Sequence, residues 1–260
     1  MNGTVQTLSA RDNPLLARLR RLARDGTAYR KEGVVWIEGE HLCGALLARG
    51  GTVAQSVISE SAWQLAPLRT LALSAQRVAR VSDGLFAGVS ALDSPAGLGF
   101  MVAVPAAAAL QPHAASVVLD RVQDAGNVGS ILRSAAAMGF TQVIAIEGTA
   151  GLWSPKVLRA GMGAHFALHL VEGVGDDALA SLAVPLLAAS SRGGQALDEA
   201  ALRFPCAWVL GHEGQGVSPA LLAHCAQTLR IPQPGGEESL NVAAAAAICL
   251  YATRRPGAER

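Results

Sequence analysis

The chain has 260 residues, about half of them hydrophobic (51%), and a formal net charge of +1, so it can bury a sizeable core but is not a polycation as a whole. Its polar start lacks the apolar segment of a secretory signal, and no apolar run reaches the roughly 18 residues that a membrane span needs. Four scattered cysteines show no paired spacing, which argues against a zinc site and favours a reducing compartment. These features predict a soluble cytoplasmic protein of one large or two ordinary domains, with no membrane partner and no metal.

The N-terminal segment departs from this overall neutrality. Residues 1–31 carry seven arginines and lysines against two aspartates, a local charge of +5. Such a patch on an otherwise neutral chain indicates that a polyanion is held at this end. A solvated helix face explains the same charges equally well.

The first part of the chain, up to about residue 104, mixes an arginine-rich helical segment with short strand-like runs. These runs are residues 34–37, 55–59, 77–81 and 99–104. Residues 105–115 then hold two prolines and no periodic polarity, which is typical of a linker.

From residue 116 onward the pattern becomes regular. Apolar strand-like runs alternate with helical stretches, at residues 116–119, 142–146, 167–171, 185–190, 207–210 and 228–231. Ser154-Pro155 and Ser218-Pro219 each place a hydroxyl N-cap before a proline suited to the first helical position. The alternation predicts an α/β fold with a parallel sheet covered by helices on both faces. Ligands of such sheets bind at the loops beyond the carboxyl ends of the strands.

The first of three unusual strand-end loops lies in "LDRVQDAGNVGSILRSAAAMGF", residues 119–140. We expect Asn127 to cap the helix that follows and Gly139 to end it. Arg133 lies off the helix's apolar stripe and is free to reach into the strand-end crevice; the stripe is Val128, Ile131, Leu132 and Ala135. A capped helix with one solvated arginine is the alternative interpretation.

The second loop is "VLGHEGQGVSP", residues 209–219. Its three closely spaced glycines let the backbone approach a ligand and adopt positive φ. A tight turn alone accounts for the glycines, but it does not account for the carboxylate of Glu213 among them. We interpret His212 as structural or peripheral, because a single histidine without a partner is weak evidence for a site.

The third loop opens "IPQPGGEESLNVAAAAAICLYATRR", residues 231–255. A loop rich in proline and glycine leads into Ser239, Leu240 and Asn241, and a helix with five consecutive alanines follows. Small side chains favour close packing of this helix, and Arg254-Arg255 suit its C-terminal dipole. Asn241 could serve only as an N-cap, whereas Glu238 and Ser239 have no evident structural role.

Taken together and in this order, the three loops resemble the motifs of the SpoU/TrmH family of RNA ribose 2′-O-methyltransferases. "DAGNVGSILR" (124–133) is similar to the family's Asp-Pro-x-Asn-x-Gly-x-x-x-Arg element, "GHEGQG" to Gly-x-Glu-x-x-Gly, and "IPQPGGEESLNVAAAAA" to Ile-Pro…Ser-Leu-Asn-Val. "SPKVLRAGMGAHF" (154–166) resembles the segment after the family's second strand, so the likeness extends over 116–255. Two departures are Ala125 in place of the usual proline and Gly161-Met162 in place of small polar residues.

The N-terminal half resembles, more loosely, the small α/β RNA substrate-binding domain often found ahead of this catalytic domain. The sequence segments that show this likeness are "LSARDNPLLARLRRL", "YRKEGVVWIEGEHL" and "SPAGLGFMVAVP". The resemblance therefore implies an RNA-binding domain at 1–104, a linker at 105–115 and a methyltransferase domain at 116–260.

For the cofactor, the resemblance implies a deep trefoil knot at the C-terminal end of the sheet, a rare chain connection. The loops of that knot bind S-adenosylmethionine, here with Gly211, Ile231 and Leu240 lining the pocket. It also implies a homodimer that shares its active site across the interface, which gives the alanine-rich helix a packing partner.

For catalysis, the resemblance assigns Arg133 to the reacting hydroxyl, either as the base or as an electrostatic stabiliser of the developing alkoxide. Asn127 would orient Arg133 or the nucleotide, and Glu213 would position the arginine side chain. Ser239 and Asn241 would complete the pocket around the target ribose.

The substrate expected from the N-terminal domain is ribosomal RNA, by family analogy. Two alternatives are ribose methylation of transfer RNA and a non-catalytic RNA-binding or ribosome-assembly factor that kept the fold. A nicotinamide or flavin enzyme is a further alternative, but it needs Gly-x-Gly-x-x-Gly after a strand, and "GNVGS" supplies only half of that.

Overall fold

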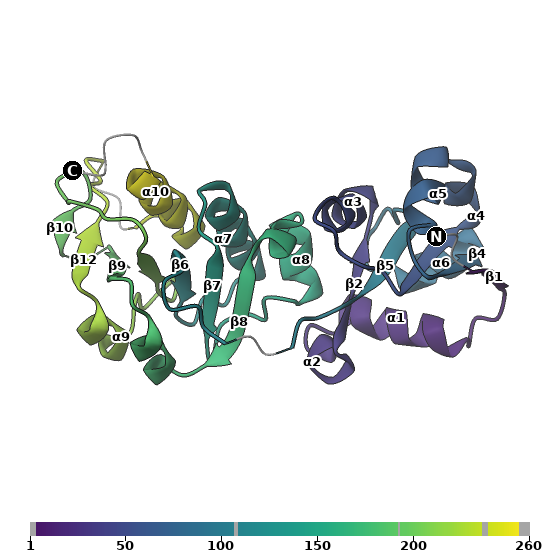
Figure 1. Ribbon diagram of the computed structural model, residues 1–260, viewed down its shortest axis with the longest axis horizontal. Coiled ribbons are helices and arrows are strands. Elements are labelled where there is room, and N and C mark those ends of the chain that lie inside the picture. The colour runs from purple at the N-terminus through teal and green to yellow at the C-terminus, as the bar shows by residue number, and fades with distance from the viewer. Residues whose placement is uncertain (1–3, 107–108, 192, 236–238, 255–260) are drawn as a thin grey trace. The chain divides into compact units, whose positions relative to one another are not determined.

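The computed structural model describes residues 4–106, 109–191, 193–235 and 239–254 (Figure 1). The chain divides into two compact units, Met1–Ala106 with Trp153–Phe166, and Ala107–Leu152 with Ala167–Arg260. The segment 153–166 thus groups with the first unit, whereas the sequence motifs assign it to the second domain.

The first unit contains a five-stranded mixed sheet in the order β1-β4-β3-β5-β2. Its strands are β1 (Thr4–Leu8), β2 (Val34–Glu38), β3 (Gln55–Ser59), β4 (Arg77–Val81) and β5 (Leu98–Ala103). β1, β4 and β3 run parallel, and β5 lies antiparallel between β3 and β2. Four of these strands match the predicted runs, while β1 was not predicted.

Helices cover this sheet on both faces. They are α1 (Pro14–Arg24), α2 (Ala28–Glu32), α3 (Glu40–Ala48), α4 (Glu60–Gln64), α5 (Ala66–Ala72), α6 (Asp83–Val89) and α8 (Pro155–Gly161). Asn13 caps α1 by accepting the N–H of Leu15, and Pro14 stands at the first helical position. The buried leucines of α1 pack with Trp36 and Phe86 in one apolar cluster; these leucines are Leu16, Leu19 and Leu22.

The basic patch of the sequence lies largely on α1, and part of it is neutralised. Arg18 and Arg21 both form ion pairs with Glu32 at the end of α2. The helix is therefore amphipathic, with its leucines buried and its arginines on the other side.

The second unit contains a seven-stranded sheet in the order β10-β12-β9-β11-β6-β7-β8. Its strands are β6 (Ser116–Leu119), β7 (Gln142–Ile146), β8 (His169–Val174), β9 (Leu186–Ser190), β10 (Gln195–Ala196), β11 (Ala207–Leu210) and β12 (Gln227–Arg230). Every neighbouring pair is parallel, which confirms the predicted parallel sheet. β8 begins and ends later than predicted, and the two-residue β10 was not predicted.

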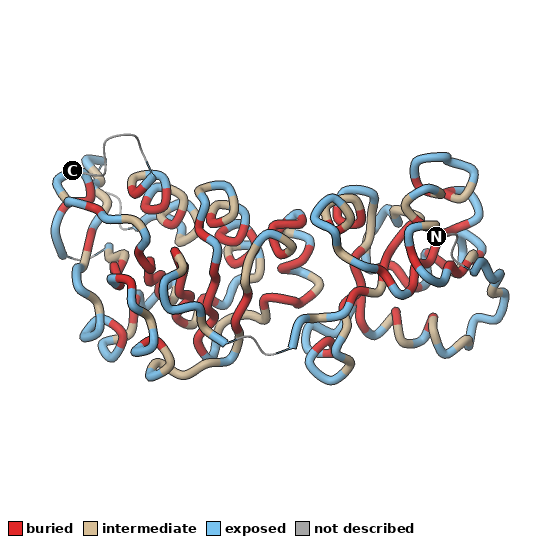
Figure 2. Tube along the Cα trace, in the orientation of Figure 1, coloured by how far each residue is buried: buried red, intermediate tan, exposed pale blue. Residues whose placement is uncertain are grey.

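The helices of this unit are α7 (Ala125–Ala137), α9 (Pro219–His224) and α10 (Val242–Arg254), with 3-10 turns at Ala164–Ala167 and Asp176–Ser181. α7 and α10 lie side by side (Figure 1). Trp208 of β11 donates its indole N–H to Thr253 of α10 at 2.9 Å. A second apolar cluster includes residues of the strands together with Leu221 of α9 and Leu179 of the second 3-10 turn. The central strands β6, β7 and β11 are fully buried, whereas β8, β10 and β12 each carry exposed residues (Figure 2).

Strand register places the loops after β6, β7 and β11 at one edge of this sheet. β6 pairs directly with β7 on one side and with β11 on the other. Leu119, the last residue of β6, pairs with Ala145 and with Leu210. The loops that begin after these three parallel strands therefore start at the same edge.

Both predicted Ser-Pro starts are confirmed. Ser154 accepts the N–H of Val157 at the start of α8, and Ser218 accepts the N–H of Leu221 at the start of α9. In the part of the chain that the structure describes, no helix combines the length and apolarity needed to cross a bilayer.

Candidate active site

The loops after β6 and β11 are joined by a buried carboxylate, Asp120. It directly follows β6, is only 1% exposed, and accepts the N–H of Ser218 at 2.6 Å. Its own N–H donates to the carbonyl of Leu210 at 2.8 Å. Asp120 therefore fixes the far end of the glycine-rich loop against the end of β6.

The glycine-rich loop doubles back on itself. A Cβ at position 211 would overlap the backbone of Gly216 and Val217, so only glycine fits there. His212 and Gly216 exchange backbone hydrogen bonds of 3.1 and 2.8 Å. The Nδ1 atom of His212 accepts the N–H groups of the next turn, Gly214 and Gln215. His212 thus stabilises the loop, which confirms its structural interpretation.

Glu213 projects from this loop toward the start of α7. Its Oε1 accepts the side-chain N–H of Asn127 at 3.1 Å and the backbone N–H of Asp124 at 3.2 Å, while Oε2 accepts the N–H of Gln123 at 3.4 Å. Partial burial raises the pKa of Glu213, but these hydrogen bonds and one from its own N–H outweigh that effect and leave the pKa below its ordinary value. Glu213 is therefore an ionised hydrogen-bond acceptor at neutral pH.

Asn127 and Asn241 connect this carboxylate to the third loop. Asn241 donates its side-chain N–H to Asn127 Oδ1 at 2.9 Å. Its Oδ1 caps α10 by accepting the N–H groups of Ala243 and Ala244. A carboxylate only accepts, so Asn127 must present its amide nitrogen to Glu213 and its oxygen to Asn241. One hydrogen-bonded chain, Asn241–Asn127–Glu213, thus spans all three predicted motifs.

The start of α7 corrects one expectation. Asp124, not Asn127, is the N-cap, and its Oδ1 accepts the N–H of Asn127 at 2.8 Å. The helix therefore begins earlier than predicted and leaves the Asn127 side chain free to bridge the other two loops. The predicted apolar stripe is confirmed, since all four of its residues are fully buried.

Arg133 lies exposed on α7, about 1.7 turns beyond Asn127. Among the described residues it forms no hydrogen bond and no ion pair. The expected contact with Glu213 is therefore absent, because that carboxylate is occupied by Asn127 and by backbone N–H groups. The guanidinium donors of Arg133 are left for a ligand.

The remaining predicted site residues lie around the third loop. Ile231 directly follows β12 and is half-buried, and Gly211 is buried directly after β11. Ser239 and Leu240 are exposed beside Asn241. Glu238 and Arg255, which the sequence also singled out, lie outside the described residues. The cofactor and ribose contacts of this set stay predictions.

Sequence reasoning missed Arg121. Its φ of +58° lies in the left-handed region, which few residues other than glycine adopt. Its guanidinium forms a two-pronged ion pair with Asp120, at 2.8 and 3.3 Å, and donates to Gln215 Oε1 at 3.0 Å. The hydrogen bond to Asp120 raises the pKa of Arg121. Asp120 was visible in the sequence as a charge at a strand end, but nothing there indicates the backbone conformation of Arg121.

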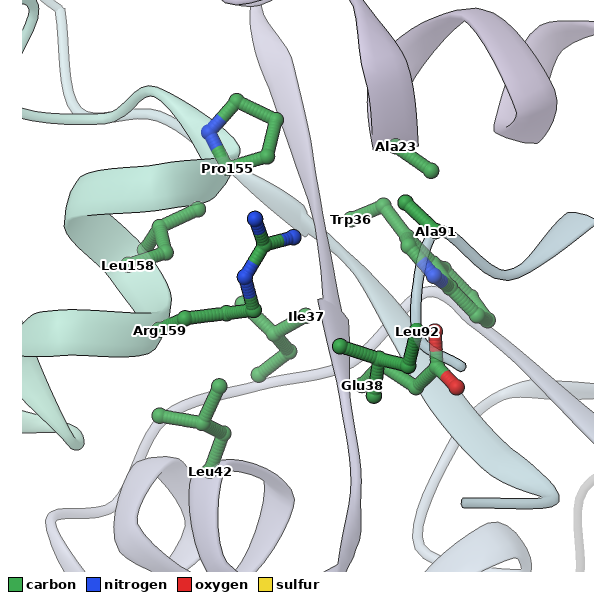
Figure 3. A pocket seen from close by; sticks show the side chains of 10 residues that line it. All are labelled: Ala23, Trp36, Ile37, Glu38, Leu42, Ala91, Leu92, Pro155, Leu158 and Arg159. Carbon is green, nitrogen blue, oxygen red and sulfur yellow. The ribbon is translucent and has the colours of Figure 1, made fainter. Parts of the chain in front are cut away.

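A small pocket in the first unit contains none of the predicted site residues (Figure 3). Arg159 projects among its lining side chains, which include Trp36 and Leu158. The carboxylate of Glu38, also in the lining, already accepts the Ser90 hydroxyl and the N–H of Ala96. Within the described part of the chain, no cluster of histidine, cysteine, aspartate or glutamate offers a metal site.

Comparison with known proteins gives a consistent result. The model of the SpoU rRNA Methylase family matches residues 114–251. A 23S rRNA guanosine 2′-O-methyltransferase of Bacillus subtilis, RlmP, is 30% identical over 86% of this chain and 90% of its own. An uncharacterised tRNA/rRNA methyltransferase of Synechocystis is 30% identical over 98% of this chain and 96% of its own.

Among solved structures, a putative RNA methyltransferase of the TrmH family from Porphyromonas gingivalis superposes with a TM-score of 0.83 at 31% identity. That alignment covers 94% of this chain and 98% of the other. The likeness therefore extends through both compact units and is not confined to the region of the family model.

Proposed function

Because the chain belongs to the SpoU rRNA Methylase family, we propose that it transfers a methyl group from S-adenosylmethionine to a ribose 2′-hydroxyl of ribosomal RNA. The observation that carries the assignment is the hydrogen-bonded chain Asn241–Asn127–Glu213. It brings the three motif loops together beside an arginine whose donors are unoccupied. A named relative that methylates a guanosine 2′-oxygen of 23S rRNA supports ribosomal over transfer RNA.

The reaction places two demands on this site. A ribose hydroxyl is a weak nucleophile, so it must be aligned with the methyl group and must lose its proton during attack. S-adenosylmethionine, when bound, supplies an electrophilic methyl group on a sulfonium. The protein's own task is therefore to orient the ribose and stabilise the oxygen as negative charge develops on it.

Arg133 suits the second task. An arginine stays charged at neutral pH, so we assign it to the electrostatic role, gripping the neighbouring phosphate and stabilising the developing alkoxide. A proton-accepting Arg133 is the alternative, and it would require a guanidinium, which stays protonated in proteins, to give up a proton first. Arg133 is exposed on α7 and its donors are unoccupied, so its side chain can contact the RNA in either role.

The hydrogen-bonded chain suits the first task. Glu213 and Asn241 hold Asn127 from both sides, so the Asn127 side chain cannot turn freely. Asn127 would then orient the nucleotide next to Arg133, while Ser239 and Asn241 complete the pocket around the ribose.

For the cofactor, the proposed pocket residues are Gly211, Ile231 and Leu240. The folded-back backbone at Gly211 leaves no room for a side chain, and Leu240 offers an apolar surface that is 39% exposed. Both features fit a ligand held by backbone groups and apolar contact.

The proposal extends to the organisation of the chain. Residues 1–104 serve as the RNA-binding domain, 105–115 as the linker and 116–260 as the catalytic domain, with a trefoil knot at the C-terminal end of its sheet. We further propose a cytoplasmic homodimer with α10 at the interface, which the exposure of Ile248 (40%) and Tyr251 (61%) on that helix supports.

The test is transfer of a labelled methyl group from S-adenosylmethionine to RNA that lacks the modification, supplied as naked RNA and as ribosomal particles. Wild type is compared with Arg133→Ala and with Arg203→Ala, a matched loss of an exposed arginine in the same unit. We expect label in alkali-resistant dinucleotides of ribosomal RNA, lost only in Arg133→Ala. Label in transfer RNA would select that alternative, and a wild type without S-adenosylmethionine binding would favour the non-catalytic RNA-binding factor.

A further inference from the structure

The backbone at Arg121 is held in its unusual conformation by the loop after β7. The N–H of Arg121 donates to the hydroxyl of Thr149 at 3.0 Å, and that hydroxyl donates to the carbonyl of Leu119 at 2.8 Å. Gly148 leaves space for the arginine stem, since a Cβ there would lie 3.2 Å from Arg121 Cγ. Left-handed backbone at a residue with a long side chain is uncommon and is a reason to look for a role.

The side chain of Arg121 connects two loops. It neutralises Asp120, whose buried carboxylate also holds Ser218. Its third nitrogen, Nη1, donates to Gln215 in the middle of the glycine-rich loop. The same guanidinium thus secures both the end of that loop and its centre.

The glycine-rich loop depends on such contacts from outside. Three glycines in six residues give it many accessible backbone conformations, so fixing one of them costs conformational entropy. Asp120 holds the end of the loop at Ser218, and Glu213 ties it to the start of α7. The side chain of Gln215 is held by Arg121. A loop ordered before ligand binding saves that ordering cost when the ligand binds.

We propose that Arg121 is a positioning residue for the methyltransferase reaction, and that it holds the glycine-rich loop, residues 209–219, in the shape that binds S-adenosylmethionine. The inference rests on the proposed function, because it takes this loop to be part of the cofactor pocket. Arg121 acts through Gln215 and Asp120 and touches neither the cofactor nor the reacting atoms.

Two substitutions in the full-length chain test this role. Arg121→Gly removes the guanidinium while glycine keeps the left-handed backbone without strain. Gln215→Ala removes only the hydrogen bond between Arg121 and Gln215 and leaves the Asp120–Arg121 ion pair intact. This variant therefore tests the role of Arg121 even if Arg121→Gly is unstable. Met162→Gly is the matched control, because Met162 is the other non-glycine residue with positive φ in the described chain, at 47°.

The measurements are the Kd for S-adenosylmethionine by calorimetry, the KM values for cofactor and RNA, and the melting temperature. We expect Arg121→Gly and Gln215→Ala each to raise the cofactor Kd by about 10-fold, and the double variant to do no worse than the weaker-binding single variant. KM for RNA and kcat at saturating cofactor should stay within about 3-fold of wild type. Met162→Gly should bind the cofactor as wild type does.

Three results would overturn the inference. Unchanged cofactor affinity in both variants would show that the loop does not need Arg121, and additive losses in the double variant would show that the Arg121–Gln215 contact is not the cause. A higher KM for RNA with unchanged cofactor affinity would make Arg121 a phosphate-binding residue instead. A wild type that binds no S-adenosylmethionine contradicts the proposed function itself, so the two failures are distinguishable.

Discussion

The two sheets of this protein place their polar side chains differently. In the second unit every strand pair is parallel, so the loops after β6, β7 and β11 begin at one edge. In the first unit β5 runs against its neighbours, so its carboxyl end lies at the edge opposite to the carboxyl ends of the other four strands. Glu38, at the end of β2, holds the segment between α6 and β5 by accepting from the Ser90 hydroxyl and the N–H of Ala96. The loops after β6 and β11 therefore contribute polar groups from distant motifs to one site, whereas Glu38 of the first sheet anchors a connecting segment.

Arg133 gives the sharpest test of this comparison. Arg133→Ala should lower kcat by roughly 10²- to 10³-fold, the loss typical of one transition-state donor, and should change the free energy of unfolding by less than about 0.5 kcal/mol. Its neighbour Leu132 is fully buried, so Leu132→Ala should cost about 2–5 kcal/mol of stability. Denaturant unfolding and methyl-transfer kinetics separate the two effects, and a destabilised Arg133→Ala would contradict the assignment.

Two glycines test whether the close backbone contacts of the second unit serve cofactor binding while those of the first unit serve stability. Gly211→Ala forces a methyl group into the backbone at Gly216 and should abolish measurable S-adenosylmethionine binding. Gly99→Ala collides with the indole of Trp36 in the first unit, which should cost about 1–3 kcal/mol of stability. Cofactor affinity, measured by calorimetry below the melting temperature, should be normal in Gly99→Ala. Equal losses of affinity in both variants would erase the contrast between the sheets.

Asn241 permits a finer separation within the site. Asn241→Ala loses both the cap of α10 and the bond to Asn127, and should cost about 1 kcal/mol of stability as well as activity. Asn241→Ser keeps a capping hydroxyl but loses the amide donor, so we expect near-normal stability with reduced activity. If Asn241→Ser were fully active, the contact with Asn127 would be dispensable.

Substitution of Glu213 should have the smallest effect of these variants, a change in the free energy of unfolding that depends on pH. The folded-state pKa of Glu213 is lowered, so the ionised carboxylate contributes stability above the ordinary value of about 4.3, and this is lost as pH falls toward the folded-state pKa. The difference in unfolding free energy between wild type and Glu213→Gln should therefore be larger at pH 7 than near pH 3.5. A difference that grew on acidification would contradict the lowered pKa.

Much of the fold could be predicted from the sequence because apolar runs mark buried strands directly. Val117 and Val118, or Trp208 and Val209, occupy continuous apolar stretches bounded by turn residues, and these became β6 and β11. β1 escaped prediction because four of its five residues are exposed, so its sequence carries no burial pattern.

The sequence predicted which residues form the site but not which of them are hydrogen-bonded to one another. The motifs indicated Asn127, Glu213 and Asn241, yet the pairing of Glu213 with Asn127 instead of Arg133 depends on where α7 begins. That start is set by Asp124, which caps the helix three residues before the expected cap Asn127. Arg121 could not be predicted, because its φ depends on Thr149 and Gly148 from a distant loop.

The cap of α10 also provides a probe of the catalytic loops. The amide protons of Ala243 and Ala244 are hydrogen-bonded to the same side chain that reaches Asn127, so they are protected from solvent only while Asn241 faces the site. Their hydrogen-exchange rates therefore report whether the three loops are assembled. A ligand that stabilises the assembled loops would slow hydrogen exchange at Ala243 and Ala244 without contacting α10. Hydrogen exchange would therefore detect binding without a labelled substrate.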